Sequence, residues 1–219
     1  MCSARRAEAT VADDIWPVVH AERRALADDL APLTAEQWSA PSLCEGRTVL
    51  DTLAHMVATA GGTPLAFVGK LASSGFRFER MTAKEIVAMS AGGPAATLER
   101  FRAVVDASSG PPGPTDSWLG ETLVHAEDIR RPLGLRHGYP VDAVIRVIGF
   151  YSRSNLLIGG KKRVAGLTLR ATDTDWSYGD GPVVEGSAMS LLMVTAGRPA
   201  YLDDLSGQGL DELRRRFPA

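Results

Sequence analysis

The sequence predicts a helical bundle up to about His137, followed by a smaller α+β unit. Ahead of His137 the apolar residues recur with the three- to four-residue spacing of amphipathic helices. Residues 167–172 instead alternate apolar and polar side chains, which is the two-residue period of a strand with one buried face. We therefore expect two domains, residues 1–138 and residues 139–219.

The composition is that of an ordinary soluble protein. The 219-residue chain is long enough for one large domain or two modest ones, and 45% of its residues are hydrophobic and 23% charged. Lys and Arg number 24 against 26 for Asp and Glu, so no positive surplus favours nucleic acid as a partner. No apolar run reaches the roughly 18 residues that predict a membrane-spanning helix. We expect neither nucleic acid nor a membrane as a partner.

Two features favour the cytoplasm. The N-terminal segment MCSARRAEATVADD contains two arginines but lacks the apolar stretch of a secretory signal. Cys2 and Cys44 are the only cysteines, which argues against a disulfide framework and fits a reducing compartment. The same count excludes a cysteine-rich zinc site.

In the bundle, capping residues and glycines delimit the expected helices. The segment after Thr48 is apolar nearly all round and ends at Gly61, so we place it in the middle of the bundle. The sequence GPPGPTD predicts a linker into the last helix. The expected helices of the bundle are residues 8–33, a short helix carrying Trp38 after a capping box at 34–37, 48–60, a helix beginning at 82–85, 94–107, and a helix from 117 towards 134.

Beyond His137 the elements are shorter. Pro140 opens a helix through Tyr151, and the glycines and basic residues of 159–163 interrupt it. The expected elements that follow are a strand at 167–172, a strand signal at Trp176 and Tyr178, a short strand at Val183–Val184, and an apolar helix over 187–196 closed by Gly197.

His55 lies inside the apolar helix predicted over 48–60. An imidazole there costs desolvation free energy unless a partner satisfies its nitrogens. Either a hydrogen bond or a metal ion could be that partner, and for a single histidine the hydrogen bond is the commoner case.

Glu121 and His125 strengthen the metal hypothesis. They stand four residues apart, so their side chains project from one face of a helix and could bind one ion. Trp118, Thr122 and Ile129 share this arc of the helix, which indicates that it faces the core rather than solvent as a surface Glu–His pair would. His55 is then the natural third ligand. Two nitrogens and one oxygen leave a fourth position open, as in catalytic zinc sites.

Other polar residues have simpler roles beside a functional one. Asp51 and Asp128 could orient the two histidines, although Asp51 also fits a helix cap and Asp128 an exposed charge. Arg198 could bind an anionic substrate, although an arginine at the end of a helix is also explained by the macrodipole. His20, on a charged helix, and His137, in a turn, do not have the surroundings of ligands, and Asp173 and Asp175 are typical turn residues.

At these residues the chain resembles the mycothiol-dependent maleylpyruvate isomerase family, a branch of the DinB-like metal-binding four-helix bundles. The resemblance rests on PSLCEGRTVLDTLAHM, on GETLVHAEDIRRPLG, and on the run from ATDTDW to GLDEL that contains GSAMSLLMVTAGRP. One departure is Arg47, which stands where the first motif usually has tryptophan. The resemblance implies a DinB-like four-helix bundle followed by a small, sterol-carrier-like α/β domain.

The resemblance also implies a function. Its metal ligands fall on His55, Glu121 and His125, and its C-terminal substrate-handling arginine falls most plausibly on Arg198. It implies mycothiol as a thiol cosubstrate, activated by zinc, or by nickel or iron, for cis–trans isomerisation or for S-transfer to a small electrophile. The sequence does not choose between these reactions, and it leaves open a monomer or a homodimer. A non-catalytic protein that binds a metal or small ligand is the alternative.

Overall fold

The computed structural model describes residues 14–156 and 158–217. Within these residues the chain forms two compact units. The first contains the described residues up to Ser39 together with Val49–Thr122, and the second contains Ala40–Thr48 with the described residues from Leu123 onward. The domain boundary expected after residue 138 stays a prediction, because a division into compact units does not test which segments fold independently.

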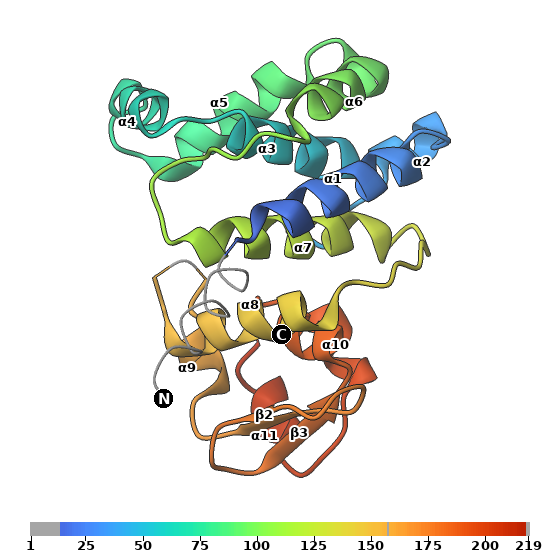
Figure 1. Cartoon of the computed structure of the whole chain (residues 1–219), viewed down its shortest axis with the longest axis vertical. Helices are drawn as coiled ribbons and strands as arrows, with labels where there is room; N and C mark the ends of the chain where they lie inside the picture. The colour runs from blue at the N-terminus through green and yellow to red at the C-terminus, as the bar shows by residue number, and fades with distance from the viewer. Residues whose placement is uncertain (1–13, 157, 218–219) are drawn as a thin grey trace, which may run out of the picture. The chain divides into compact units, whose positions relative to one another are not determined.

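The first unit is helical, with α3 at its centre. Helix α3 packs against α5 and α6, which lie beside it in Figure 1, and most of its residues are buried, as expected of an apolar segment. The elements are α1 (Trp16–Leu30), α2 (Ala35–Ser39), α3 (Val49–Ala60), α4 (Pro64–Ser73), α5 (Phe78–Ser90), α6 (Gly93–Val104) and the first part of α7 (Thr115–Arg130).

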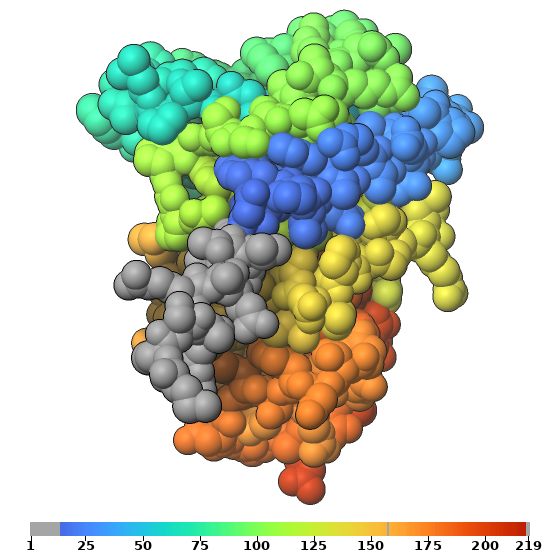
Figure 2. Space-filling view, in the orientation of Figure 1, coloured from blue at the N-terminus to red at the C-terminus, as the bar shows by residue number. Residues whose placement is uncertain are grey.

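Two helices of this unit differ from the sequence prediction. Helix α4 was not predicted; its Thr63 cap accepts a hydrogen bond from the Ala66 N–H, and Pro64 occupies the first turn. All of α4 is described and none of its residues is buried, so it lacks the buried face on which the prediction relied; Figure 2 shows it at the surface. Helix α5 begins at Phe78, earlier than the predicted start at 82–85. Thr82 is a buried residue inside this helix and not its cap.

The second unit combines helices with a small sheet. Strand β1 is central, antiparallel to β2 and parallel to β3, and α10 packs against α8 and β1. Leu169 of β1, which is fully buried, pairs with Tyr178 and Val184. Besides the end of α7, the elements are α8 (Val141–Arg153), α9 (Gly160–Val164), β1 (Thr168–Ala171), β2 (Ser177–Tyr178), β3 (Val183–Gly186), α10 (Ala188–Thr195), the 3-10 helix η1 (Pro199–Asp204) and α11 (Leu210–Arg214).

The expected fold class is confirmed: a helical part is followed by a small three-stranded sheet with helices. Some bounds differ. The first helix begins at Trp16, and the part of it predicted over residues 8–13 lies outside the described residues. The segment 159–163, predicted as a break, belongs largely to α9, and η1 and α11 were not predicted. In the described part of the chain no helix is long and apolar enough to cross a membrane.

Gly181 provides a test of how tightly the sheet is packed. A Cβ at this position would lie 2.0 Å from the carbonyl oxygen of Gly166, whereas a Cβ at Gly138 would meet nothing within 4 Å. We expect Gly181→Ala to lower the free energy of unfolding by about 1–3 kcal/mol through overpacking, and Gly138→Ala to change it by no more than about 0.5 kcal/mol. Urea unfolding followed by circular dichroism measures both. Equal midpoints would contradict the packing.

Candidate metal centre

His55 and Glu121 face each other within the first unit. His55 lies on α3 and Glu121 on α7, and the distance from His55 Nε2 to Glu121 Oε2 is 3.7 Å. This distance exceeds that of a hydrogen bond, roughly 2.7–3.2 Å. It is close to the separation of about 3.4 Å between nitrogen and oxygen donors that share a tetrahedral zinc ion. The two side chains are only 14% and 15% exposed. The distance between them fits a shared cation better than a direct hydrogen bond.

Thr59 fixes the other oxygen of the Glu121 carboxylate. The Thr59 hydroxyl lies one turn after His55 on α3 and donates to Glu121 Oε1 at 2.6 Å. That bond leaves Oε2, the oxygen nearer His55, as the candidate ligand atom. Buried Arg23 lies within electrostatic reach of the carboxylate: burial lowers the pKa of Arg23, and the charge of Glu121 opposes this effect. Sequence reasoning missed Thr59, because only the fold brings it to Glu121.

His125 follows Glu121 by one turn on the continuous helix α7. Its Nδ1 lies 2.9 Å from Asp128 Oδ2, so the ring donates Nδ1–H to this carboxylate and keeps Nε2 for a metal. Candidate donor atoms of His55, Glu121 and His125 all lie within 4.8 Å of one another. The structure thus brings together the three residues that the sequence singled out.

Asp128 connects His125 to Arg198 within the second unit. The carboxylate is completely buried and accepts Arg198 Nε at 2.9 Å and Nη2 at 2.6 Å. Burial alone would raise the pKa of Asp128, but the hydrogen bonds and charges of Arg198 and His125 outweigh it and hold the pKa below its usual value. For Arg198, burial lowers the pKa, and the bonds and charge of Asp128 raise it to a greater extent. Asp128 is therefore a buried anion, and the alternative of an exposed charge is wrong.

The guanidinium of Arg198 is engaged by protein atoms. Besides the two bonds to Asp128, its Nη1 donates to the carbonyl oxygen of Ala196 at 2.8 Å. All three of its nitrogens thus have a protein acceptor. The sequence suggested an anionic substrate as the partner of Arg198, and it gave no sign of Asp128 or the Ala196 carbonyl oxygen as partners.

The loop at residues 40–48 brings Cys44 close to His125 and Asp128. Leu43 N–H donates to the backbone oxygen of Asp128 at 3.0 Å. Donor atoms of Cys44, His125 and Asp128 lie within 4.8 Å of one another, and all three residues belong to the second unit. In the sequence, Cys44 counted only as evidence against a disulfide framework and a cysteine-rich zinc site. The Pro-Ser-Leu-Cys turn just ahead of the His55 helix was the available signal.

The remaining polar candidates have local roles. His20 stacks on Trp16 and its Nε2 lies 3.3 Å from the Ala107 carbonyl oxygen, while His137 packs edge-on against Tyr139. Asp173 accepts the Ala188 N–H at the start of α10, in keeping with a turn residue. Asp51 lies in the first turn of α3.

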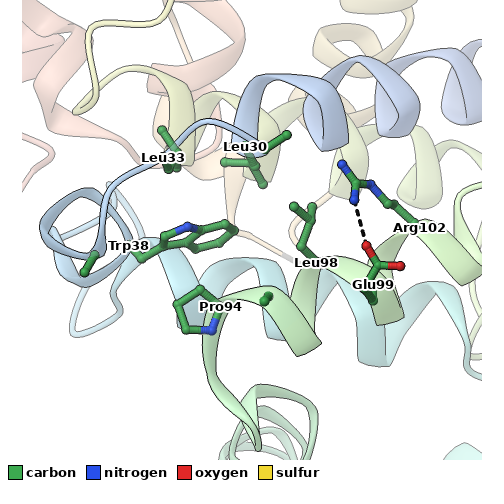
Figure 3. A pocket seen from close by; sticks show the side chains of 10 residues that line it. Leu30, Leu33, Trp38, Pro94, Leu98, Glu99 and Arg102 are labelled. Atoms are coloured by element: carbon green, nitrogen blue, oxygen red, sulfur yellow. Dashed lines mark hydrogen bonds and ion pairs between the residues drawn. The ribbon is translucent and has the colours of Figure 1, made fainter.

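A separate groove on the first unit contains none of these residues. It measures about 530 Å³, and Leu30, Trp38 and Leu98 form its apolar part beside an ion pair between Glu99 and Arg102 (Figure 3). Glu99 and Arg102 are the charged residues among those that line it.

Comparisons with known proteins agree with this fold. Residues 19–110 match the family model of the mycothiol maleylpyruvate isomerase N-terminal domain. Crystal structures of the mycothiol-dependent maleylpyruvate isomerase and of a histidine-to-alanine mutant of it are similar to this chain, each with 17% sequence identity and a TM-score of 0.59. Each similarity covers 90% of this chain and 92% of the other. No curated protein gives a significant match.

The family match and the structural similarity confirm the resemblance found in the sequence. The matched range includes α3 and His55, whereas α7 with Glu121 and His125 follows it. Residues 19–110 are thus similar to the mycothiol maleylpyruvate isomerase N-terminal domain, and most of the chain has the fold of the solved isomerase.

Proposed function

We propose that this protein is a metal-dependent enzyme that uses mycothiol, a low-molecular-weight thiol, on a small electrophile. The observation that carries the proposal is the cluster of His55, Glu121 and His125, whose donor atoms lie within 4.8 Å of one another. The family supports mycothiol as the thiol. A cytoplasmic location suits a thiol cosubstrate, because thiols stay reduced there.

Zinc is the metal that we propose for these ligands. Two imidazoles and one carboxylate are a common donor set of catalytic zinc, and they leave one position for a further ligand. Nickel and iron accept the same donors and are the alternatives. The hydrogen bonds from Thr59 to Glu121 and between His125 and Asp128 support the proposal, because such second bonds orient metal ligands.

A bound zinc ion would hold the sulfur of the thiol as a thiolate near neutral pH, well below the ordinary thiol pKa of about 8.5. The protein residues orient the site. Thr59 holds the Glu121 carboxylate, and Asp128 keeps the Nδ1 proton on His125. We assign Arg198 the role of a positioning residue, which acts on His125 through Asp128.

Two reactions fit an activated thiolate. Reversible addition to a cis carbon–carbon double bond converts it to a single bond, which can rotate; elimination of the thiol then yields the trans isomer. Alternatively, the sulfur displaces a leaving group from an electrophilic carbon, and a stable thioether and the free leaving group result. We propose isomerisation first, because the solved structures of the same fold are of a mycothiol-dependent isomerase.

The proposal is tested by metal content and thiol turnover measured together. We expect protein purified without added metal to contain about one ion per chain, and His55→Ala to lose both the ion and mycothiol-dependent turnover, because a first ligand is removed. His137→Ala is the matched control and should retain both. Elemental analysis gives the metal, and maleylpyruvate and a panel of electrophiles give the activity.

The outcomes separate the candidate functions. Full metal content and activity in His55→Ala would refute the metal site. Metal that binds stoichiometrically without turnover of mycothiol on any substrate would favour the non-catalytic alternative. Thioether products without isomerisation would identify an S-transferase.

Thr59 offers a test of ligand orientation. We expect Thr59→Val to weaken metal affinity by about 10–100-fold, because the Glu121 carboxylate loses the bond that directs it. Thr59→Ser keeps the hydroxyl and should bind metal like the wild type. Competition with a chromogenic chelator measures the affinities. Equal metal affinity of the Val and Ser variants would show that the Thr59 hydroxyl does not orient the Glu121 ligand.

Asp128 and Arg198 form a pair whose effects on protein stability and on metal affinity can be measured separately. Arg198→Met leaves Asp128 buried without its main counter-charge, so we expect a loss of about 3–5 kcal/mol in the free energy of unfolding. Asp128→Asn combined with Arg198→Met should recover much of this stability. Metal affinity should stay lowered, because the amide no longer holds His125 as a carboxylate does. Chemical denaturation and chelator competition provide the two measurements; additive losses of stability would contradict direct coupling.

A further inference from the structure

Helix α4 contacts α5 along one side. The Phe67 ring lies near that of Phe78 on α5, with 6.4 Å between the ring centroids, and Lys70 pairs with Glu85 of α5 at 2.7 Å. Phe67 and Lys70 are three positions apart and therefore lie on the same side of the helix. At 100° per residue, the side that faces away from α5 is centred on Leu65.

This outer side of α4 is apolar and exposed. Leu65, Val68 and Ala72 share it, with the i, i+3, i+7 spacing of one helix face. Leu65 is 84% and Val68 is 56% exposed, and a Cβ at Gly69 on the same side would meet nothing within 4 Å. Figure 2 shows α4 at the surface of the molecule. An exposed apolar helix face of this kind marks an interaction surface.

Phe76 adds an aromatic ring in the turn after α4. Its N–H donates to the carbonyl oxygen of Leu71, and Gly75 before it has a φ of +68°, as at many helix ends. Phe76 itself has a φ of +58°, a conformation that favours glycine and costs a bulky residue free energy. Its ring is 76% exposed, so burial does not offset this cost. Stability of the fold therefore does not account for a phenylalanine here, whereas an interaction surface does.

The charge of this part of the chain complements an anionic surface. Residues 63–90, which include α4 and α5, contain four basic and two acidic residues and thus carry a net charge of +2, whereas the whole chain carries −2. Arg77, Arg80 and Lys84 are exposed, and among the described residues none of their side chains has an ion-pair partner. Three cations are therefore available to a negatively charged partner.

The same charges argue against a second copy of the chain as the partner. A two-fold symmetric interface brings the same surface of both chains together, so it would place these basic residues near their own copies. Like charges that meet at an interface oppose association. The negative head groups of anionic phospholipids attract Lys and Arg instead.

We propose that the surface formed by Leu65, Val68, Phe76 and Phe78, together with the basic residues of α5, binds reversibly to membranes that contain anionic phospholipids. With ten residues α4 is about 15 Å long, so it would lie along the membrane surface with its apolar face among the acyl chains. The expectation of no membrane partner rested on the lack of a spanning run, which adsorption does not require. The inference is independent of the metal centre and goes beyond the proposed activity.

Cosedimentation with lipid vesicles tests this inference on the full chain. At low salt the protein should sediment with vesicles of equal parts phosphatidylglycerol and phosphatidylcholine, and much less with vesicles of phosphatidylcholine alone. Added salt should release it, because salt screens the attraction. Phe76→Gly should lower partitioning by about tenfold or more, because the apolar ring is lost. Glycine suits the positive φ at this position, so this variant keeps its fold.

Leu156→Ser is the matched control. Leu156 lies in the second unit and is 74% exposed, close to the exposure of Phe76, so its replacement should leave vesicle binding unchanged. Replacement of Arg77 and Arg80 by glutamine should weaken binding by about fivefold for each charge. Amide exchange locates the contact: vesicles should slow exchange in residues 63–78 and leave it unchanged in α3.

Two results would overturn the inference. One is absence of binding to the anionic vesicles; if the protein is then a dimer that Phe76→Gly dissociates in analytical ultracentrifugation, the surface belongs to a second copy. The other is binding that Phe76→Gly and Leu156→Ser weaken equally. Either result leaves the proposed metal-dependent activity standing, because vesicle binding does not involve the metal ligands.

Discussion

A carboxylate that is fully removed from water, Asp128, organises the second unit around the site. It accepts hydrogen bonds from Arg198 and His125, and its backbone oxygen holds the loop that carries Cys44. An isolated charge in such surroundings would be prohibitively costly, so the guanidinium is a condition for the anion to exist there. One residue thus sets the tautomer of a proposed ligand, the position of an arginine and the place of a thiol.

The sequence predicted the fold class and the three candidate ligands for local reasons. The spacing of Glu121 and His125 follows from helix geometry alone, and His55 stood out as a polar ring in an apolar helix. The partners of these side chains depend on tertiary structure. Thr59 meets Glu121 across 62 positions of sequence, and Arg198 meets Asp128 across 70, and no local pattern encodes such a contact.

The family match and the donor geometry support different parts of the proposed function. The family match ends at residue 110, so it covers His55 but not Glu121 or His125. The case for the latter two rests on donor geometry and on the hydrogen bonds of Thr59 and Asp128. The solved isomerase structures, at 17% identity, contribute the fold of most of the chain. The family match and the geometry agree, and together they support the proposed use of a metal-activated thiol.

Helix α4 follows directly after α3, the helix that carries His55. It is ten residues long, and a helix of this length is marginal in water without tertiary support. Its packing is limited to partly exposed contacts, such as the Phe67 ring near that of Phe78, and Leu65 is 84% exposed. Helix α4 therefore belongs to the least protected part of the first unit, where local opening and amide exchange cost little free energy. We expect this segment to open locally without opening the core around α3.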